Sequence, residues 1–524
     1  MANEQVIVED EDSKYLPKNP WSAVGPILLA VFIYVMDGTI ANVALPHMAG
    51  SFSATRDESM WILTSYLIAS GIVIPSVDFF SKLLGRKNFF VISILVFTIA
   101  SLLCGMARNL TEMVIYRVLQ GAGGGGIVPI SQAVIMESFP KEQRGKGMAI
   151  FGMGIILAPI IGPVLGGWIT DNWSWPWIFF INVPFGCMAA ILCHKTMFNP
   201  PYSWRQKGVK IDGLGFLFLI IWLFFLQIFF DKGNNADWFN ATWICWVFGI
   251  SCASAVAFFI SQIMRKDTLL DLSVFKDRNF VIGTLIQVVM QSVLYASLAI
   301  LPQFLQSMMG YTAFLSGYSM MPRGLGSFTA MVICALIADK VDKRKLVAVG
   351  LTLLGCAGLF FGFLNLQIAS INIMIPNYIM GVGMGLCMVP IINLSLETLT
   401  NQQMTNASGI QNLLKNIGGA IGTSLVATML TRFAQVHQYM MVGNLSELNE
   451  VFVNRVNTYT AALSQYYPTE VARHMAEYLQ YGTLIKQSTL WAFMDAFRIF
   501  GLLCFALIPL LLLLKRSKFQ PKKK

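Results

Sequence analysis

The sequence predicts an all-α membrane protein with about fourteen transmembrane helices. Of its 524 residues, 56% are hydrophobic and only 12% are charged, about half the charged fraction of an ordinary soluble domain. Apolar segments of roughly 20 residues, the length of a helix that crosses the hydrocarbon layer, recur from end to end. Lys and Arg gather in alternate connections between these segments, as they do in membrane proteins of fixed orientation. We therefore expect lipid to be the solvent around most of the chain.

The expected spans follow one another with short connections over most of the chain. The first twenty residues are polar, and the apolar segment after them is longer than the core of a secretory signal, so it is expected to remain as the first span. The expected spans are near 21–45, 58–80, 89–107, 111–136, 147–169, 177–194, 211–230, 241–263, 279–303, 314–338, 345–366, 371–395, 405–433 and 490–514.

Positive charge predicts the orientation. An even number of spans puts both ends of the chain on one side, and that side receives most of the Lys and Arg, including the basic tail 516–524. Because basic connections stay in the cytoplasm, both termini are expected to be cytoplasmic. The net charge of +10 is thereby explained by topology and does not indicate nucleic-acid binding.

The spans form two similar blocks, as expected of a transporter built from repeats. The connection 434–489 is long and polar, and is expected to lie outside with amphipathic helices around 447–465 and 469–487. The expected units are a cytoplasmic tail 1–20, a six-helix bundle 21–194, a linker with two extra spans 195–278, a second six-helix bundle 279–515 that includes the periplasmic loop 434–489, and a basic tail 516–524.

Two ionisable residues in the apolar spans need a reason, because a charge in hydrocarbon is costly. Asp37 lies in the first span and Arg117 in the fourth, at similar expected depth. Burial disfavours the charged carboxylate and a nearby cation favours it, so such a pair can be poised to take and release a proton. The alternative is a static ion pair that locks the two helices together.

Further polar residues interrupt the tenth and thirteenth spans. Ser408, Asn412 and Lys415 share one helical face, with Gln411 beside them. That face either lines a water-filled cavity or packs on polar partners. Arg323 stands between Pro322 and a glycine, which suggests a local break in the helix whose freed carbonyls the guanidinium could satisfy. Structural and functional roles are equally open for this arginine.

Small residues indicate close helix packing. The glycine-rich stretch 121–126 lacks the ending of a phosphate loop, and Gly162, Pro163, Gly166 and Gly167 lie in the fifth span. The chain shows no catalytic triad, nucleotide-binding loop or metal-ligand spacing. We therefore expect no enzyme activity, metal or cofactor. Energy is expected from an ion gradient, a separate subunit or the substrate's own gradient.

Several motifs resemble a known family. The run MDGTIANVALP at 36–46 resembles the first-helix signature of the fourteen-helix drug:proton antiporters of the major facilitator superfamily. RVLQGAG at 117–123 resembles the fourth-helix motif tied to proton coupling, and APIIGPVLGG at 158–167 resembles the fifth-helix antiporter motif. WPWIFFINVPFG at 175–186, DLSVFKDRNF at 271–280 and GGAIGTS at 418–424 are further family hallmarks. The closest group is the EmrB-type permease.

The resemblance implies a fold and a function. The fold would be that of the superfamily, two six-helix bundles plus two extra central helices. The function would be proton-coupled efflux of hydrophobic or amphipathic drugs across a bacterial inner membrane, in a three-part pump with an EmrA-like periplasmic adaptor and an outer-membrane channel. Asp37 and Arg117 match the proton-coupling positions. Cavity candidates are Asn42, Gln120, Arg323, Ser408, Gln411, Asn412 and Lys415.

Other functions stay open at this stage. An importer, or an exporter of one metabolite such as a siderophore or lipid, would use the same fold, although the fifth-helix motif favours export. A non-transporting scaffold or sensor would need neither the Asp37–Arg117 pair nor the polar face of the thirteenth span. A channel is disfavoured because no filter segment is visible.

Overall fold

The computed structural model describes residues 21–140, 143–197, 204, 213–264, 270–337, 341–400 and 403–515. Every regular element within these ranges is a helix, which confirms the all-α prediction. In the same part of the chain, 13 helices are long and apolar enough to cross a membrane. The expected span near 314–338 is a further helix, α14 (Ala313–Ile337), which runs beside α16. The fold is thus the predicted one, with about fourteen spans.

The first group of helices corresponds to the expected spans one to six. Two of these spans are divided: the second contains a 3-10 turn, and the fourth changes helix at Gly125 and Gly126. The helices are α1 (Trp21–Ser51), α2 (Arg56–Ser59), α3 (Trp61–Val73), η2 (Ile74–Ser76), α4 (Val77–Leu84), α5 (Arg86–Gly105), α6 (Leu110–Gly124), α7 (Ile127–Ser138), α8 (Arg144–Asn172), α9 (Trp177–Phe180) and α10 (Asn182–Thr196).

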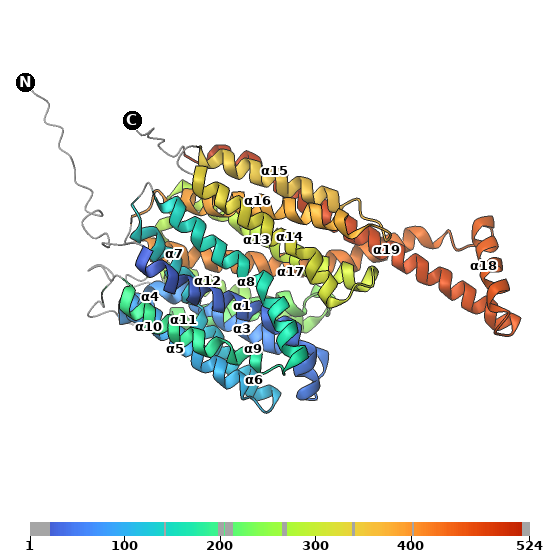
Figure 1. Ribbon diagram of the computed structural model, residues 1–524, viewed down its shortest axis with the longest axis horizontal. Coiled ribbons are helices and arrows are strands. Elements are labelled where there is room, and N and C mark those ends of the chain that lie inside the picture. Colours follow the sequence, from blue (N-terminus) through green and yellow to red (C-terminus); the bar gives the residue numbers. More distant parts are fainter. Residues whose placement is uncertain are drawn as a thin grey trace, which may run out of the picture.

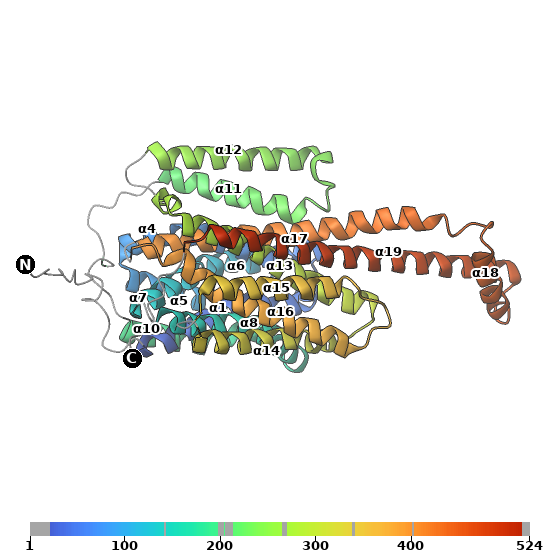
Figure 2. The same cartoon turned by 90° about the horizontal axis from the view of Figure 1, so that it is seen from above.

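The remaining helices form a peripheral pair and a second bundle. The pair α11 and α12 lies alongside the bundles, where α11 touches α3 and α17 (Figure 2). The helices are α11 (Gly213–Lys232), η4 (Trp238–Asn240), α12 (Thr242–Met264), η5 (Leu272–Lys276), α13 (Arg278–Gln303), the π-helical turn η6 (Phe304–Met308), α14, α15 (Lys343–Phe361), α16 (Ser370–Leu396), α17 (Met404–Val442), α18 (Glu450–Leu463), α19 (Thr469–Leu507) and η8 (Ile508–Leu513).

Side-chain caps mark several helix starts. Asn109 accepts a hydrogen bond from the backbone N–H of Glu112 at the start of α6, and Asp277 accepts one from Phe280 at the start of α13. Such caps satisfy N–H groups that have no partner inside the helix. They are local signals, readable in the sequence, that begin a helix where a polar connection ends.

The first and last described residues lie at the same end of the molecule (Figure 1). We call this end, with Trp21 and Lys515, the terminal end. At the opposite end α17 and α19 continue past the other helices, and α18 packs on α19 far from the bundles (Figures 1 and 2). We call residues 434–489 the hairpin extension and that end the hairpin end.

The hairpin extension differs in part from the prediction. The expected helix 447–465 is present as α18, but the expected helix 469–487 is not separate from the last span. One continuous helix, α19, covers both, because no Pro lies between 469 and 507 to end it, and the helix continues through Gly482 and Gly501. For the same reason α17 continues past the expected end at 433 as far as Val442, next to Gly443.

The two bundles meet in the half of the molecule near the terminal end. There α17 packs against α4 and α7, and α14 and α16 pack against α8. One apolar core joins both bundles in this half and includes Ile135 and Phe151 of the first with Met331 and Leu413 of the second. Toward the hairpin end the cores are separate, one built only from the first bundle and another only from the second.

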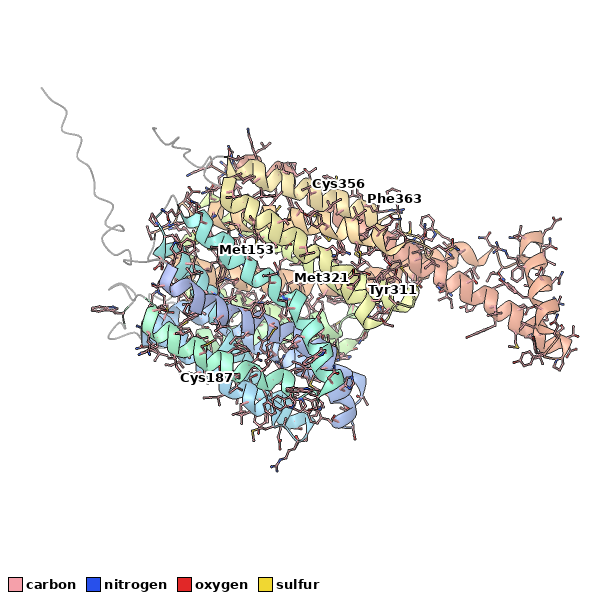
Figure 3. The ribbon with its side chains drawn as sticks, viewed as in Figure 1. Met153, Cys187, Tyr311, Met321, Cys356 and Phe363 are labelled. Carbon is pink, nitrogen blue, oxygen red and sulfur yellow. The ribbon has the colours of Figure 1, made fainter. Side chains whose placement is uncertain are left out.

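Apolar side chains also cover the outside of the helices. Cys187, Cys356 and Phe363 point away from the bundles, and Phe363 lies near the base of the hairpin extension (Figure 3). Free cysteine is usually buried, because it behaves as a small apolar side chain. In a protein surrounded by lipid, the outer surface is as apolar as the interior, so a cysteine suits either place.

Candidate functional site

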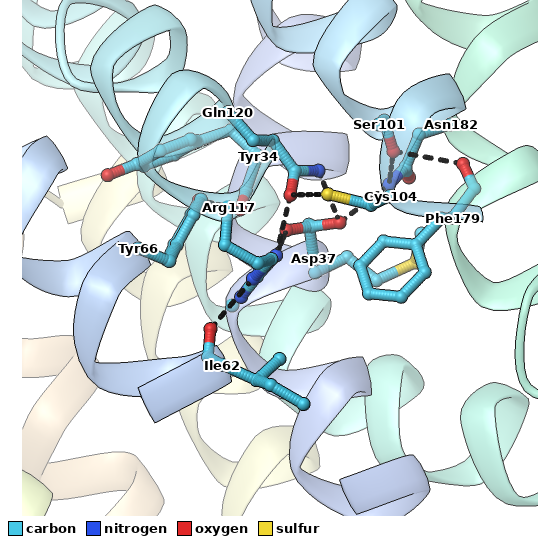
Figure 4. Close-up of polar contacts among 12 residues, drawn as sticks. Tyr34, Asp37, Ile62, Tyr66, Ser101, Cys104, Arg117, Gln120, Phe179 and Asn182 are labelled. Atoms are coloured by element: carbon cyan, nitrogen blue, oxygen red, sulfur yellow. Dashed lines mark hydrogen bonds and ion pairs between the residues drawn. The ribbon is translucent and has the colours of Figure 1, made fainter. Parts of the chain in front are cut away.

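Asp37 and Arg117 form a buried ion pair between α1 and α6. The Arg117 Nη1 lies 2.7 Å from Asp37 Oδ2, and neither residue has any exposed surface. Figure 4 shows the pair among side chains from α1, α3, α5, α6 and α10. The contact expected from their similar depth is therefore present in the structure.

Two amides complete the surroundings of the carboxylate. Gln120 Nε2 donates to Asp37 Oδ1 at 2.9 Å, and Asn182 Nδ2 donates to the same oxygen at 2.7 Å. Together with Arg117, these donors give the charged form of Asp37 three hydrogen bonds inside a closed core. Gln120, expected to line a cavity, instead belongs to the ion-pair network. Its Oε1 also accepts from Arg117 Nη1 at 2.7 Å.

Arg117 is held from several sides. Its Nε donates to the backbone carbonyl of Ile62 at 3.0 Å, and its guanidinium carbon lies 4.2 Å from the centre of the Tyr66 ring and 5.6 Å from that of Phe179. Stacking on aromatic faces suits an arginine, because the planar cation is weakly hydrated. The guanidinium is therefore positioned by α3 and α9 even when its carboxylate partner changes charge.

Asn182 is the site residue that the sequence analysis did not single out. It begins α10, and besides Asp37 it donates to Ser101 Oγ at 3.1 Å, which in turn donates to the carbonyl of Phe179. A single amide within the apolar run of residues 177–186 was the available signal. Its partner could not be read from the sequence, because α1 and α10 come together only in the folded bundle.

The polar face of the thirteenth span packs mostly on polar partners. Gln132 of α7 donates to Gln411 Oε1 at 3.0 Å and accepts from Asn412 at 3.1 Å. Ser408 donates to the carbonyl of Pro129 at 2.9 Å. These three residues of α17 therefore join the two bundles near the terminal end. Of the two expectations for this face, contact with polar partners is the one observed for them.

Lys415, the fourth residue of that face, lies apart from this contact. It lines a small cavity together with Gln287, Met290, Gln291, Met384, Met388, Ile391 and Ile392. The cavity volume is about 10 Å³, close to the least that admits one water molecule. Of the four residues named on this face, Lys415 is therefore the one that the structure places at a cavity.

The other two cavity candidates lie elsewhere. Asn42 is exposed on α1, and its side chain bonds only to the Gly38 carbonyl of its own helix, at 3.5 Å. Arg323 is buried in the second bundle and donates to Asn377 Oδ1 and Ser297 Oγ, each at 3.1 Å. The expected helix break at Arg323 is wrong, because α14 continues through Pro322. The guanidinium bonds to side chains of α13 and α16 instead of freed carbonyls.

Small residues of α8 permit its close contact with α1. A Cβ built on Gly166 would lie 2.6 Å from Ile40 Cγ1, and one on Gly162 would overlap the Thr39 hydroxyl. At Gly167 the space is larger, with the nearest atom of α1 at 3.8 Å. The side chain of Pro163 lies outside the described part of the structure. Close approach therefore requires glycine at 162 and 166 more than at 167.

Comparison with known proteins identifies the class. The profile of the Major Facilitator Superfamily matches residues 27–423. The chain therefore belongs to the major facilitator superfamily, a family of multi-pass membrane transporters, and the all-helical fold agrees with this. The crystal structure of the human organic anion transporter MFSD10 shares this fold, with a TM-score of 0.61, 13% identity, and coverage of 94% of this chain and 100% of that one.

Sequence similarity places the chain near the EmrB-type permeases. It is 32% identical to the multidrug export protein EmrB of Escherichia coli (strain K12) over 432 residues, which cover 80% of this chain and 82% of that protein. It is also 32% identical to the fatty acid resistance protein FarB of Neisseria gonorrhoeae over 454 residues, 86% of this chain and 85% of that protein. The resemblance seen in the motifs is thus confirmed.

Proposed function

We propose that this protein exports hydrophobic or amphipathic molecules across a bacterial inner membrane and exchanges them for protons. The observation that carries the proposal is the buried Asp37–Arg117 pair, in a chain that is similar to a multidrug export protein over most of its length. A carboxylate without exposed surface, held by one cation and two amides, is a suitable proton-binding group in a membrane transporter. No cofactor takes part in this proposal, because the proton gradient supplies the energy.

The coupling follows from the surroundings of Asp37. When Asp37 binds a proton, the ion pair with Arg117 is lost and the three donors face a neutral acid. The network then favours a different arrangement of α1, α6 and α10. Because Asp37 is fully buried in this conformation, the proton can be exchanged only after the helices move. A bundle movement of this kind around a central site is the general mechanism of such transporters.

The free energy of the proton gradient is sufficient for substantial export. One pH unit across the membrane corresponds to about 1.4 kcal/mol per proton, and about 100 mV adds about 2.3 kcal/mol. One proton per cycle could therefore support a gradient of a few hundredfold for a neutral substrate.

Proteoliposomes test the proposal. A pH step is imposed, and the movement of a fluorescent hydrophobic dye is followed together with the internal pH, for wild type and Asp37→Asn. We expect opposite, coupled fluxes in wild type and no pH-driven dye movement in Asp37→Asn. Asp495→Asn is a matched control, because it also removes a carboxylate paired with an arginine, at 2.9 Å from Arg498, but near the hairpin extension.

The outcomes separate the possible functions. Coupled transport by correctly folded Asp37→Asn would refute the role of Asp37. Proton flux started by a lipid or siderophore but by no dye would keep the mechanism and indicate a dedicated substrate, an alternative favoured by the similarity to a protein named for fatty acid resistance. The absence of any substrate-dependent flux would favour a scaffold or sensor.

The hairpin extension supports a proposal about partners. It projects beyond the bundles and exposes large apolar side chains, with 94% of Leu448, 80% of Tyr466 and 75% of Tyr478 accessible. Exposed apolar residues outside the lipid layer indicate a protein contact. We propose that the extension contacts a periplasmic adaptor of the EmrA type and, through it, an outer-membrane channel.

Two variants test this contact. Deletion of 440–485 is expected to abolish export into the medium, and Tyr478→Glu is expected to weaken co-purification with the adaptor while the protein still transports in proteoliposomes. Normal export to the medium by the deletion variant would contradict the proposal. The same proposal requires both chain ends to be cytoplasmic, so a protease added outside intact cells must not cleave a tag on either end.

A further inference from the structure

Lys415 lies in the second bundle, close to the core that joins the two bundles. Its cavity is built from α13, α16 and α17, all of the second bundle. One lining residue, Met388, packs against both the core that joins the bundles and the core of the second bundle alone. The cavity thus sits where the joined half of the molecule changes to the half with separate cores. Substrate sites of transporters built from repeats lie near the middle of the membrane, where the bundles meet.

The cavity combines one charge with an apolar lining. The ammonium of Lys415 is accompanied by the amides of Gln287 and Gln291, and the other lining residues are methionines and isoleucines. No carboxylate is among these lining residues. The lining therefore offers hydrogen-bond donors and a positive charge at one place, and adaptable thioether side chains around it.

Lys415 differs from Arg117 and Arg323 in having no polar partner in the described part of the structure. Arg117 pairs with Asp37, and Arg323 is hydrogen-bonded to two side chains. Within the described ranges, the ammonium of Lys415 has neither a hydrogen bond nor an ion pair. An uncompensated charge at this depth is unfavourable and is retained where it serves a function. A ligand with a negative charge would remove this unfavourable state.

We propose that Lys415 binds the acid group of an anionic amphipathic substrate, whose apolar part contacts Met290, Met384 and Met388. This inference rests on the proposed function and specifies its substrate class. The present cavity has space for about one water molecule, so the substrate enters when the bundles are further apart. A cationic drug finds no counter-charge in this lining, and the only carboxylate of the ion-pair network, Asp37, is already bonded to three donors.

Binding of three probes with one apolar body tests the inference. Pyrenebutanoic acid, pyrenebutanamide and pyrenebutylamine are titrated onto full-length protein in zwitterionic nanodiscs at neutral pH, where the carboxylic acid is ionised. Energy transfer from tryptophan to pyrene reports binding. We expect wild type to bind the acid about tenfold more tightly than the amide, as for a hydrogen bond to a charged group, and to bind the amine least.

Two substitutions at Lys415, with one control elsewhere, test whether Lys415 causes the preference for the acid. Lys415→Met keeps the length of the side chain and is expected to reduce the preference for the acid to less than about threefold, whereas Lys415→Arg retains most of it. Lys195→Met removes an exposed lysine of α10 and is expected to behave as wild type. Thermal unfolding confirms that each variant is folded, and the arginine variant keeps the test valid if the methionine variant is unstable.

Two results would overturn the inference. Equal affinity of wild type for the acid and the amide would exclude an anion site, and an unchanged preference in folded Lys415→Met would exclude Lys415 as its origin. Because binding needs no gradient, the test is independent of proton coupling. Acid preference without proton-driven transport would refute the proposed function and support this site, and proton-driven transport without acid preference would do the reverse.

Discussion

Replacing Gln132 by leucine tests whether the polar contact between α7 and α17 holds the terminal end of the bundles closed. The side chain of Gln132 donates to Gln411 and accepts from Asn412, and both bonds join the first bundle to the second. Gln132 and Gln411 have no exposed surface. Leucine has nearly the same size but neither donor nor acceptor, so the substitution removes both bonds without leaving a large cavity.

The expected magnitude follows from these two bonds. A buried hydrogen bond contributes about 0.5–1.5 kcal/mol, and a buried acceptor without a partner costs about 1–3 kcal/mol. Asn412 retains a bond to the carbonyl of Ser408 at 2.7 Å, whereas the Oε1 of Gln411 loses its partner. The closed form should therefore lose about 1–3 kcal/mol relative to a form in which this end is open to water. That shift changes the ratio of the two forms by about 5- to 150-fold.

Distance measurements between spin labels can detect this shift. Asn88 at the start of α5 and Lys345 at the start of α15 are exposed, lie near the terminal end and belong to different bundles. Labels are attached there through non-natural amino acids, because native cysteines would also react. We expect a single short distance in wild type and a larger share of a longer distance in Gln132→Leu.

A matched control separates bundle opening from general destabilisation. Gln262 is also buried, and its Oε1 accepts from the backbone N–H of Leu270 at 3.2 Å, but this contact does not join the two bundles. Gln262→Leu should lower stability and leave the label distances unchanged. The reasoning is refuted if Gln132→Leu gives the wild-type distance distribution, or if both variants show the same increase in the longer distance.

Three further predictions follow from other contacts. Asn182→Leu removes one of the three donors to Asp37 and should weaken transport driven by a pH step at least tenfold while probe binding changes less than threefold; equal losses in both would mean a merely structural role. Glu137→Gln removes the negative charge from the buried Arg86–Glu137 pair, whose atoms lie 2.8 Å apart, and should lower stability by about 1–3 kcal/mol; thermal unfolding that matches wild type would contradict this. Gly121→Ala places a methyl group against a backbone carbonyl of α3 and should cost about 1–3 kcal/mol, measured as a lower midpoint of denaturant unfolding.

Some site residues were predictable because their signal is local. Asp37 and Arg117 are ionisable residues in apolar runs, and a charge at that depth requires a partner wherever the helix packs. The existence of their contact could be inferred from matching depth, since straight helices place residues at a depth given by their position along the chain. Close packing of the glycines in α8 against a neighbour was likewise expected, although the neighbour itself was not.

Other residues could not be assigned because their role depends on a neighbour from a distant part of the chain. Ser408, Asn412 and Lys415 share one polar face of α17, yet Asn412 bonds to α7 and Lys415 lines a cavity formed with α13 and α16. Asn42 and Gln120 are both amides in family motifs, but only Gln120 reaches the carboxylate. The direction in which each amide faces depends on the rotation of its helix about the helix axis, and side-chain packing determines that rotation.

The sequence by itself determined the number and order of the spans, the apolar character of the surface and the presence of a buried charge pair. These depend on hydropathy and residue type within single segments of about 20 residues. Only the tertiary structure decided that α19 is one helix through the hairpin extension, that Asn182 completes the surroundings of Asp37, and that Lys415 lines a cavity whereas Asn412 bonds to α7. The physical reason is that lipid exerts no preference for one apolar face over another. Helix rotation and partner choice therefore follow from side-chain packing and hydrogen bonds between helices, which no single segment contains.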